Sequence, residues 1–309
     1  MADETATVRP PADPPAAVRV GAGTVAAGLL RACRPRQWLK NALVFAAPAA
    51  AGVLGSAAGL LGALIAFAAF CLAAGGAYLL NDVADVEADR RHPRKRYRPV
   101  AAGLVSVALA RTAGVVLVAA APAVAWLTGD WRLPAVVAGY LVLTFAYTFW
   151  LKHQVVVDLV AVAGCHVLRA LAGAVAVGVP VTAWFLIVIS LGSLQLVAGK
   201  REAELRARGG GDNGTRAILA AYTPGYLANV RAMSSGAMIV TYCLWALDEH
   251  PGLFYGLSIV PFVLIVLRHN LLVDRGVGEE PEELVLRDRP MLLSVALLLT
   301  LVLIGIYLS

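Results

Sequence analysis

Long apolar runs fill most of this chain, and short polar segments separate them. An uncharged run of about 20 residues can cross roughly 30 Å of hydrocarbon as a helix, so each such run predicts a membrane-spanning helix. We predict spans at residues 37–56, 58–81, 103–127, 132–150, 155–178, 182–199, 224–247, 252–272 and 291–308. The pattern therefore indicates an all-α, polytopic membrane protein whose nine transmembrane helices form one domain over residues 31–309.

The first 30 residues have a different composition, rich in proline and alanine. They lack the basic segment and short apolar core that a signal peptide requires. We expect a disordered cytoplasmic tail over residues 1–30.

Composition agrees with a membrane protein, because 60% of the residues are hydrophobic and 15% are charged, against about 25% charged in soluble domains. The four cysteines have no paired spacing, and the five histidines have no metal-ligand spacing. We therefore expect reduced, buried thiols and no zinc-type site.

Basic residues alternate between the two sides of the predicted bundle. They precede the first span and occupy every second loop, whereas the intervening loops contain almost none except Arg132. Cytoplasmic loops carry the excess of Lys and Arg, so the N-terminus is expected in the cytoplasm and the C-terminus outside. The net charge of +6 then reflects topology and affinity for anionic lipids and phosphates, and nucleic-acid binding is not expected.

An acidic motif stands where the second predicted span ends. With Asn81 at zero and 100° per residue, Asp85, Asp89 and Asp82 fall at about 40°, 80° and 100°, whereas Glu87 falls at about 240°. Charge at membrane depth costs roughly 2.5 kcal/mol or more per group, which favours a functional role. Oxygen ligands on one face suit Mg²⁺ bound to a diphosphate, with Mn²⁺ as an alternative ion. A solvated acidic helix end is the other interpretation.

A basic block follows these acids directly. Arg91, Lys95 and Arg98 are our candidates within it for substrate contacts, because Arg and Lys neutralise phosphate oxygens. The block also fits a simple marker of the cytoplasmic side, and the two interpretations are compatible.

Other candidates lie on the same predicted face of the membrane. Arg36 and Lys40 are four residues apart, so in an α-helix they would share one side and could bind one phosphate. Arg169 is deeper in the fifth span and is expected to face the interior, more as support for the fold than as a substrate contact. The remaining candidates for substrate or phosphate contacts are Asn41, Tyr147, Lys152, Asp158, Lys200, Arg201 and Glu204.

The motif Asn81-Asp82-x-x-Asp85-x-x-x-Asp89, followed by His92-Pro93 and Arg98-Pro99, resembles the first aspartate-rich motif of the UbiA superfamily of intramembrane prenyltransferases. Three further segments resemble the branch of this superfamily that transfers phosphoribosyl groups to decaprenyl phosphate. They are residues 34–41, 200–205 and 278–289.

The resemblance implies a nine-helix bundle with a lateral lipid opening, in a bacterial plasma membrane. It implies Mg²⁺-dependent transfer from phosphoribosyl diphosphate to a polyprenyl phosphate, a precursor step for cell-wall arabinan. Metal ligands would be Asn81, Asp82, Asp85 and Asp89; catalytic residues would be Asp82, Asp85, Lys152, Lys200 and Arg201. Membrane lipids are expected partners, and a homo-oligomer is left open.

One departure from the superfamily pattern is informative. Prenyl-transferring members carry a second aspartate-rich motif after the sixth span, where this chain has Lys200, Arg201, Glu202 and Glu204. This favours direct contact with phosphates over a second metal site. A UbiA-type prenyltransferase for an aromatic or tetrapyrrole acceptor is the first alternative. A transporter is the second, although its charges should line a path across the bilayer.

Overall fold

The computed structural model describes residues 22–207, 217–249, 252–277, 284–285 and 287–308. These residues are helical, and no strand occurs among them. The α-helices are α1 Ala22–Ala32, α2 Ala46–Ala50, α3 Ala57–Ala84, α4 Val86–Arg91, α5 Val107–Ala125, α6 Arg132–Phe149, α7 Val157–Ala176, α8 Ala183–Ala207, α9 Pro224–Leu244, α10 Leu253–Asp274 and α12 Arg289–Leu308. Shorter 3₁₀ or π turns are η1 Pro35–Phe45, η2 Val53–Gly55, η3 Lys95–Tyr97, η4 Trp126–Thr128, η5 Leu151–His153, η7 Ala217–Ala221 and η8 Trp245–Glu249.

Eight helices in the described ranges are long and apolar enough to cross a membrane. They are α3, α5, α6, α7, α8, α9, α10 and α12. Each coincides with one of the predicted spans to within a few residues, apart from a longer C-terminal extension of α8. The all-helical membrane fold is therefore confirmed, whereas the count of nine spanning helices is not.

The predicted first span, residues 37–56, is broken into short pieces. It contains the 3₁₀ helix η1, the five-residue helix α2 and the turn η2, with Gly52 at φ +69° between the last two. A Cβ added at Gly173 of α7 would lie 1.7 Å from the carbonyl oxygen of Val44, so this segment lies directly against α7. Pro48 and Gly52 disfavour a continuous α-helix here, which the apolar pattern alone does not reveal.

The N-terminal tail also differs from the sequence-based prediction. Residues 22–30 were expected to be disordered but belong to helix α1, and residues 1–21 lie outside the described residues. Ala32 and Leu29 pack with Leu79 of α3 and Val105, so α1 buries an apolar stripe against the bundle. Burial of that stripe stabilises the helix, since short helices depend mainly on tertiary packing.

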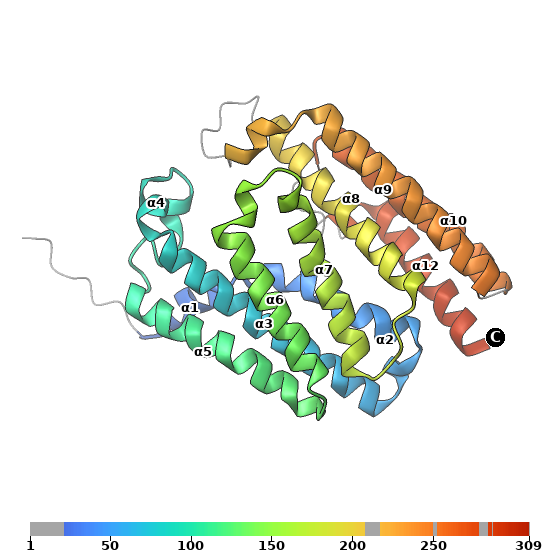
Figure 1. Ribbon diagram of the computed structural model, residues 1–309, viewed down its shortest axis with the longest axis horizontal. Coiled ribbons are helices and arrows are strands. Elements are labelled where there is room, and N and C mark those ends of the chain that lie inside the picture. The colour runs from blue at the N-terminus through green and yellow to red at the C-terminus, as the bar shows by residue number, and fades with distance from the viewer. Residues whose placement is uncertain (1–21, 208–216, 250–251, 278–283, 286, 309) are drawn as a thin grey trace, which may run out of the picture.

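The helices form two groups that meet at α7 and α8 (Figure 1). One contains α3, α5, α6 and α7, and the other contains α8, α9, α10 and α12. Tyr307, near the end of α12, donates a hydrogen bond to the carbonyl oxygen of Gly52 at 2.7 Å, which links the second group back to the broken segment. Small residues allow close approach inside the first group: a Cβ at Gly76 would lie 2.8 Å from the carbonyl oxygen of Gly114 on α5.

Figure 1 places α4, the turn between α6 and α7, and the C-terminal end of α8 at the same end of the bundle. The ion pair of Arg201 on α8 with Asp158 on α7, and its hydrogen bond to Tyr147 on α6, agree with this placement. The acidic motif and several predicted basic residues therefore occupy one end of the molecule.

Candidate active site

The acidic motif spans the junction between α3 and α4. Asp85 stands between the two helices, and the backbone keeps helical hydrogen bonds across it: Asp85 N to Asn81 O at 2.9 Å and Asp89 N to Asp85 O at 2.8 Å. The side chains of Asn81 and Asp85 are themselves joined, Nδ2 to Oδ2, at 3.1 Å. The one-turn spacing of the motif therefore survives the change of helix.

Asp82 and Asp89 converge on one guanidinium group. Arg98 Nη1 lies 3.2 Å from Asp82 Oδ1 and 2.6 Å from Asp89 Oδ2. Arg34 Nη2 adds a second contact to Asp82 Oδ1 at 2.7 Å. Both aspartates are buried, each with 2% of its surface exposed, so their charge requires nearby cations.

The chemistry of these donors suits a hard divalent cation. Asn81, Asp82, Asp85 and Asp89 offer amide and carboxylate oxygens, the ligands that Mg²⁺ prefers. Two of the carboxylates already share one cationic nitrogen, which shows that they can face a single cation. Within the described ranges no three His, Cys, Asp or Glu side chains are gathered as a metal-ligand set. The four-residue metal site stays a prediction.

Glu87 points elsewhere, as its angle on the helix predicts. It pairs with Arg90 at 2.7 Å on the exposed surface, with 68% of its side chain exposed. Of the basic block, Arg98 contacts the acids, Lys95 is half-buried and Arg91 is exposed. The structure thus places Arg98 in contact with the acidic motif, whereas the side chain of Arg91 is exposed on the surface.

A second cluster surrounds Arg201 near the end of α8. Its Nε donates to Asp158 Oδ2 at 3.1 Å, its Nη1 to Glu204 Oε2 at 2.9 Å and its Nη2 to the hydroxyl of Tyr147 at 2.9 Å. Asp158 is fully buried and Arg201 is 3% exposed. Four of the predicted substrate or catalytic residues therefore do meet, but each nitrogen of the arginine is engaged by protein.

Tyr222 completes this cluster and was not predicted. Its hydroxyl donates to Asp158 Oδ1 at 2.5 Å and accepts from the backbone N–H of Val156 at 2.6 Å. Burial, together with the hydrogen bond to Asp158, raises the pKa of Tyr222. Val156 has a positive φ of 70°, an unfavourable conformation for a β-branched residue. A lone tyrosine beyond a glycine-rich stretch carries no signal in the sequence.

The predicted lysines are half-buried and lie on three different elements. Lys40 is on η1, Lys152 is on η5 and Lys200 is on α8. Lys40 and Lys200 both lie close enough to His166 of α7 to act on it electrostatically. The fold therefore brings basic residues that are 160 positions apart toward the same part of α7.

Asn41, a predicted substrate contact, lies in a buried hydrogen-bonded network. It is fully buried, its Oδ1 accepts from Arg169 Nε at 2.8 Å, and its Nδ2 donates to Cys71 Sγ at 3.3 Å. Arg169 also donates to the hydroxyl of Tyr140 at 2.9 Å and to the carbonyl oxygen of Cys165 at 2.8 Å. The expected interior position of Arg169 is confirmed, and Asn41 is its partner.

Arg36 and Lys40 do not share a helix side, contrary to our expectation. They lie in the 3₁₀ helix η1, where side chains three residues apart align. Residues four apart then differ by about 120°. Arg36 is exposed and Lys40 is half-buried, in agreement with different directions.

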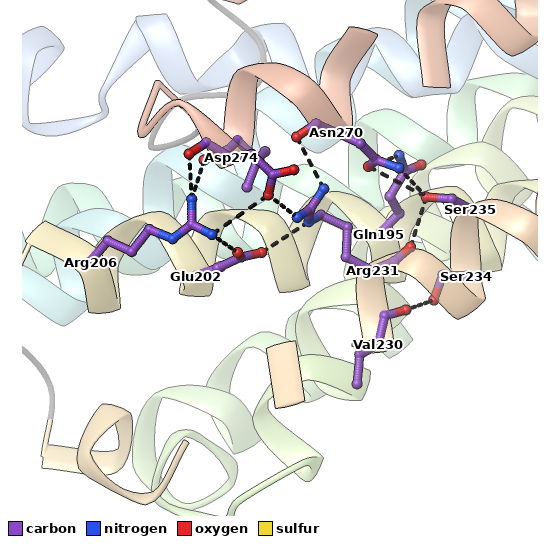
Figure 2. Close-up of polar contacts among 10 residues, drawn as sticks. Gln195, Glu202, Arg206, Val230, Arg231, Ser234, Ser235, Asn270 and Asp274 are labelled. Atoms are coloured by element: carbon purple, nitrogen blue, oxygen red, sulfur yellow. Dashed lines mark hydrogen bonds and ion pairs between the residues drawn. The ribbon is translucent and has the colours of Figure 1, made fainter. Parts of the chain in front are cut away.

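A third polar cluster joins α8, α9 and α10 (Figure 2). Glu202 is fully buried between Arg206 and Arg231, and Arg231 also contacts Asp274. Arg231 was missed, although a charged residue inside the predicted span 224–247 was a signal for it.

The UbiA prenyltransferase family model matches residues 42–296. The chain belongs to the UbiA prenyltransferase family. The resemblance inferred from the acidic motif is therefore confirmed, and the chain is a membrane-integral protein of this family.

The chain is also similar to proteins of Mycobacterium tuberculosis and Corynebacterium glutamicum. The chain is 44% identical over 281 residues to "Decaprenyl-phosphate phosphoribosyltransferase" of Mycobacterium tuberculosis, a match that covers 89% of this chain and 93% of the relative. It is 41% identical over 273 residues to the protein of the same name in Corynebacterium glutamicum, covering 86% of this chain and 82% of the relative.

Solved UbiA structures have the same fold. A UbiA homolog from Archaeoglobus fulgidus bound to GPP and Mg²⁺ matches with a TM-score of 0.70 and 17% identity, over 90% of this chain and 99% of that one. The same homolog bound to Cd²⁺ matches with a TM-score of 0.67 and 16% identity, over 90% of this chain and 99% of that one.

Proposed function

We propose that this UbiA family protein transfers the 5-phosphoribosyl group of phosphoribosyl diphosphate to decaprenyl phosphate, or a similar polyprenyl phosphate, and releases diphosphate. The observation that carries this proposal is the 44% identity, over 89% of the chain, to a relative named for that activity. The grouping of buried acids and basic side chains at one end of the bundle supports it, since both substrates carry phosphates.

The acidic motif would hold the metal. Asn81, Asp82, Asp85 and Asp89 would bind Mg²⁺ or Mn²⁺, which would neutralise negative charge on the leaving diphosphate. Solved UbiA structures with Mg²⁺ and Cd²⁺ bound support the use of a divalent ion. The bonds from Arg98 keep Asp82 and Asp89 directed at one position, so these carboxylates are already oriented for a cation.

Basic residues would bind the phosphate groups. Lys152 and Lys200 are our candidates for the phosphates of the donor, and Lys40 is our candidate for the lipid phosphate. Arg201 fits a positioning role better, since each of its side-chain nitrogens donates to Asp158, Glu204 or Tyr147. Together these cations would stabilise the negative charge that develops as the bond to the anomeric carbon breaks.

The acceptor needs no general base from the protein. A phosphate monoester has its second pKa near 6, so its oxygens are anionic at pH 7. The acceptor oxygen would attack the anomeric carbon while the diphosphate leaves with its electron pair. In this scheme the task of the chain is to bind and orient two phosphates in a site sheltered from water.

The proposed orientation follows from the alternation of basic loops. We place the N-terminus and the active site on the cytoplasmic side of a bacterial plasma membrane and the C-terminus outside. The product would then be a cytoplasmic precursor for cell-wall arabinan. The tail of the lipid substrate would extend between helices into the bilayer.

Transfer of radiolabel tests the proposal. Purified protein in detergent receives labelled phosphoribosyl diphosphate and decaprenyl phosphate, with Mg²⁺ or with a chelator. We expect label in the organic-extractable lipid with Mg²⁺ alone, and loss of that product in the Asp85→Asn variant but not in the exposed control Glu87→Gln. Absence of product from folded wild-type protein, with transfer from a prenyl diphosphate to an aromatic acceptor, would contradict it.

A further inference from the structure

Figure 2 contains a closed network of four charged side chains: Glu202 and Arg206 of α8, Arg231 of α9 and Asp274 of α10. Glu202 Oε1 contacts Arg206 Nη2 at 2.5 Å, and Glu202 Oε2 contacts Arg231 Nε at 2.9 Å. Arg231 Nη2 contacts Asp274 Oδ1 at 2.5 Å, and Arg206 Nη2 lies 3.6 Å from the same oxygen. Two arginines and two acids cancel in formal charge, so the network is neutral. Glu202 and Arg231 are buried, whereas Arg206 and Asp274 are exposed.

Backbone groups extend this network into α10. Arg206 Nη1 donates to the carbonyl oxygens of Val273 at 3.1 Å and Asp274 at 2.7 Å, and Arg231 Nη1 donates to that of Asn270 at 3.1 Å. The last carbonyl groups of a helix lack intrahelical partners, and Arg206 supplies a donor for that of Asp274, the last residue of α10. The last turn of α10 is thereby tied to α8 and α9.

The network holds α8 at a close approach to α10. A Cβ added at Gly199 would lie 3.1 Å from Val273 Cγ2 and 3.5 Å from Arg231 Cδ, so little room separates the helices there. Glu202 is fully buried and Arg231 is 5% exposed. Removing one partner of the Glu202–Arg231 pair would leave an uncompensated buried charge, so this pair strongly favours one arrangement of α8 and α9.

The same turn of α8 carries Lys200 and Arg201. At 100° per residue, Lys200 lies about 160° around the helix from Glu202, and Arg201 about 100° from it. Glu202 is anchored to Arg231 of α9, which in turn contacts Asp274 of α10, whereas Arg201 is anchored to α7 and α6. Lys200 accordingly faces away from the network and lies within electrostatic range of His166 on α7. The two anchors together determine the rotation of this turn about the helix axis.

We propose that Glu202 and Arg231 are positioning residues, which direct Lys200 toward a phosphate-bearing substrate by fixing the rotation of α8. They act through Lys200 and do not contact the substrate. The claim that a phosphate is bound there rests on the proposed function, whereas the control of Lys200 by the pair is independent of it. A pair that only stabilises the fold would affect the amount of folded protein and leave substrate affinity unchanged.

Kinetic constants of conservative variants test this proposal. Glu202→Gln and Arg231→Lys retain side-chain size or charge but lose part of the network. We expect the KM for phosphoribosyl diphosphate to rise by about fivefold or more while kcat changes less, the signature of lost binding. The matched control is Asp288→Asn, which weakens the Arg268–Asp288 pair between α10 and the start of α12, far from Lys200 in the sequence.

A second readout is independent of catalysis. Lys200 is labelled with an amine-reactive ester and quantified by mass spectrometry, with Lys40 as the internal reference. We expect the labelling rate of Lys200 relative to Lys40 to change in Glu202→Gln and Arg231→Lys but not in Asp288→Asn. If wild-type protein transfers no phosphoribosyl group, the proposed function fails, and the labelling alone decides the positioning role.

The outcomes that overturn the proposal are specific. If both variants have the same KM and the same Lys200 labelling as Asp288→Asn, the network contributes to fold stability alone. If the single variants do not fold, the double variant Glu202→Met/Arg231→Met removes both charges and fills the space with apolar atoms, which buried pairs often tolerate. The same shifts in KM and labelling are expected of that variant, and their absence there would overturn the proposal.

Discussion

Arg98 Nη1 lies 2.6 Å from Asp89 Oδ2, and the same nitrogen reaches Asp82. The two aspartates are seven positions apart along the chain, and they are brought together because the helical path continues from α3 into α4. One guanidinium thus neutralises two buried carboxylates of the motif.

The contacts of Arg98 with Asp82 and Asp89 predict that a bound metal ion can replace the charge of this arginine. In Arg98→Gln, Asp82 and Asp89 lose a shared cation, and stability should fall by about 1–3 kcal/mol without metal. Millimolar Mg²⁺ should restore stability, because it binds the folded state and replaces the lost charge. Thermal unfolding in detergent with and without Mg²⁺ measures this. A stabilisation by Mg²⁺ no larger than in wild type would contradict it.

Asp85 is predicted to matter for transfer but not for folding. It is half-buried and its side chain contacts Asn81, a contact that asparagine can preserve. Asp85→Asn should reduce transfer by about a hundredfold or more, comparable with the loss of one preorganised charge-stabilising group. Thermal unfolding should remain within about 0.5 kcal/mol of wild type. Turnover retained by this variant would refute the metal assignment.

Tyr222 is expected to support Asp158 in a pH-dependent way. Tyr222→Phe leaves Asp158 Oδ1 and the N–H of Val156 without this partner and should cost about 1–3 kcal/mol near pH 8. Burial and the hydrogen bond raise the folded pKa of Tyr222 above its unfolded value. Its contribution is therefore complete below about pH 10, the unfolded pKa, and declines as the pH rises further.

Unfolding of wild type and Tyr222→Phe at pH 8 and pH 11 checks this prediction. The difference between them should shrink at the higher pH. Tyr226→Phe is the matched control, because Tyr226 stacks on Tyr222 at 5.8 Å between ring centroids and is 42% exposed. A difference that is equal at both pH values would contradict the role assigned to the hydroxyl group.

Asn41 should be a structural residue. Asn41→Ala removes an acceptor from the buried Arg169 and should destabilise the protein by about 1–3 kcal/mol. The KM for phosphoribosyl diphosphate in the folded fraction should stay close to that of wild type. Steady-state kinetics at a temperature well below the unfolding transition measure this KM. A large rise in KM without loss of stability would contradict the prediction and indicate that Asn41 contacts the substrate.

Most of the helical architecture could be predicted, and the exceptions have clear physical causes. The eight long helices follow from uncharged runs, because membrane hydrocarbon forces the backbone to satisfy its own hydrogen bonds. The broken segment around Pro48 and Gly52 is equally apolar, so hydropathy does not distinguish it from a span. Its close contact with Gly173 of α7 appears only when the helices are packed.

The candidate site divides in the same way. The spacing of Asp82, Asp85 and Asp89 indicates a shared face because helical periodicity is local. The pairing of Arg201 with Asp158 joins residues 43 positions apart, and the position of Arg231 beside Glu202 joins residues 29 apart. Such pairings depend on which helices become neighbours, which no local pattern specifies.

Residue types and their short-range spacing are enough to establish the membrane-embedded helical fold, the acidic motif and the resemblance to the UbiA superfamily. All of these are visible in the order of the residues. Which charges neutralise one another depends instead on how the helices pack: Arg98 pairs with Asp89, Arg201 with Asp158, and Arg231 with Glu202. A buried charge requires a partner wherever the fold supplies one, and that partner can come from any helix packed beside it.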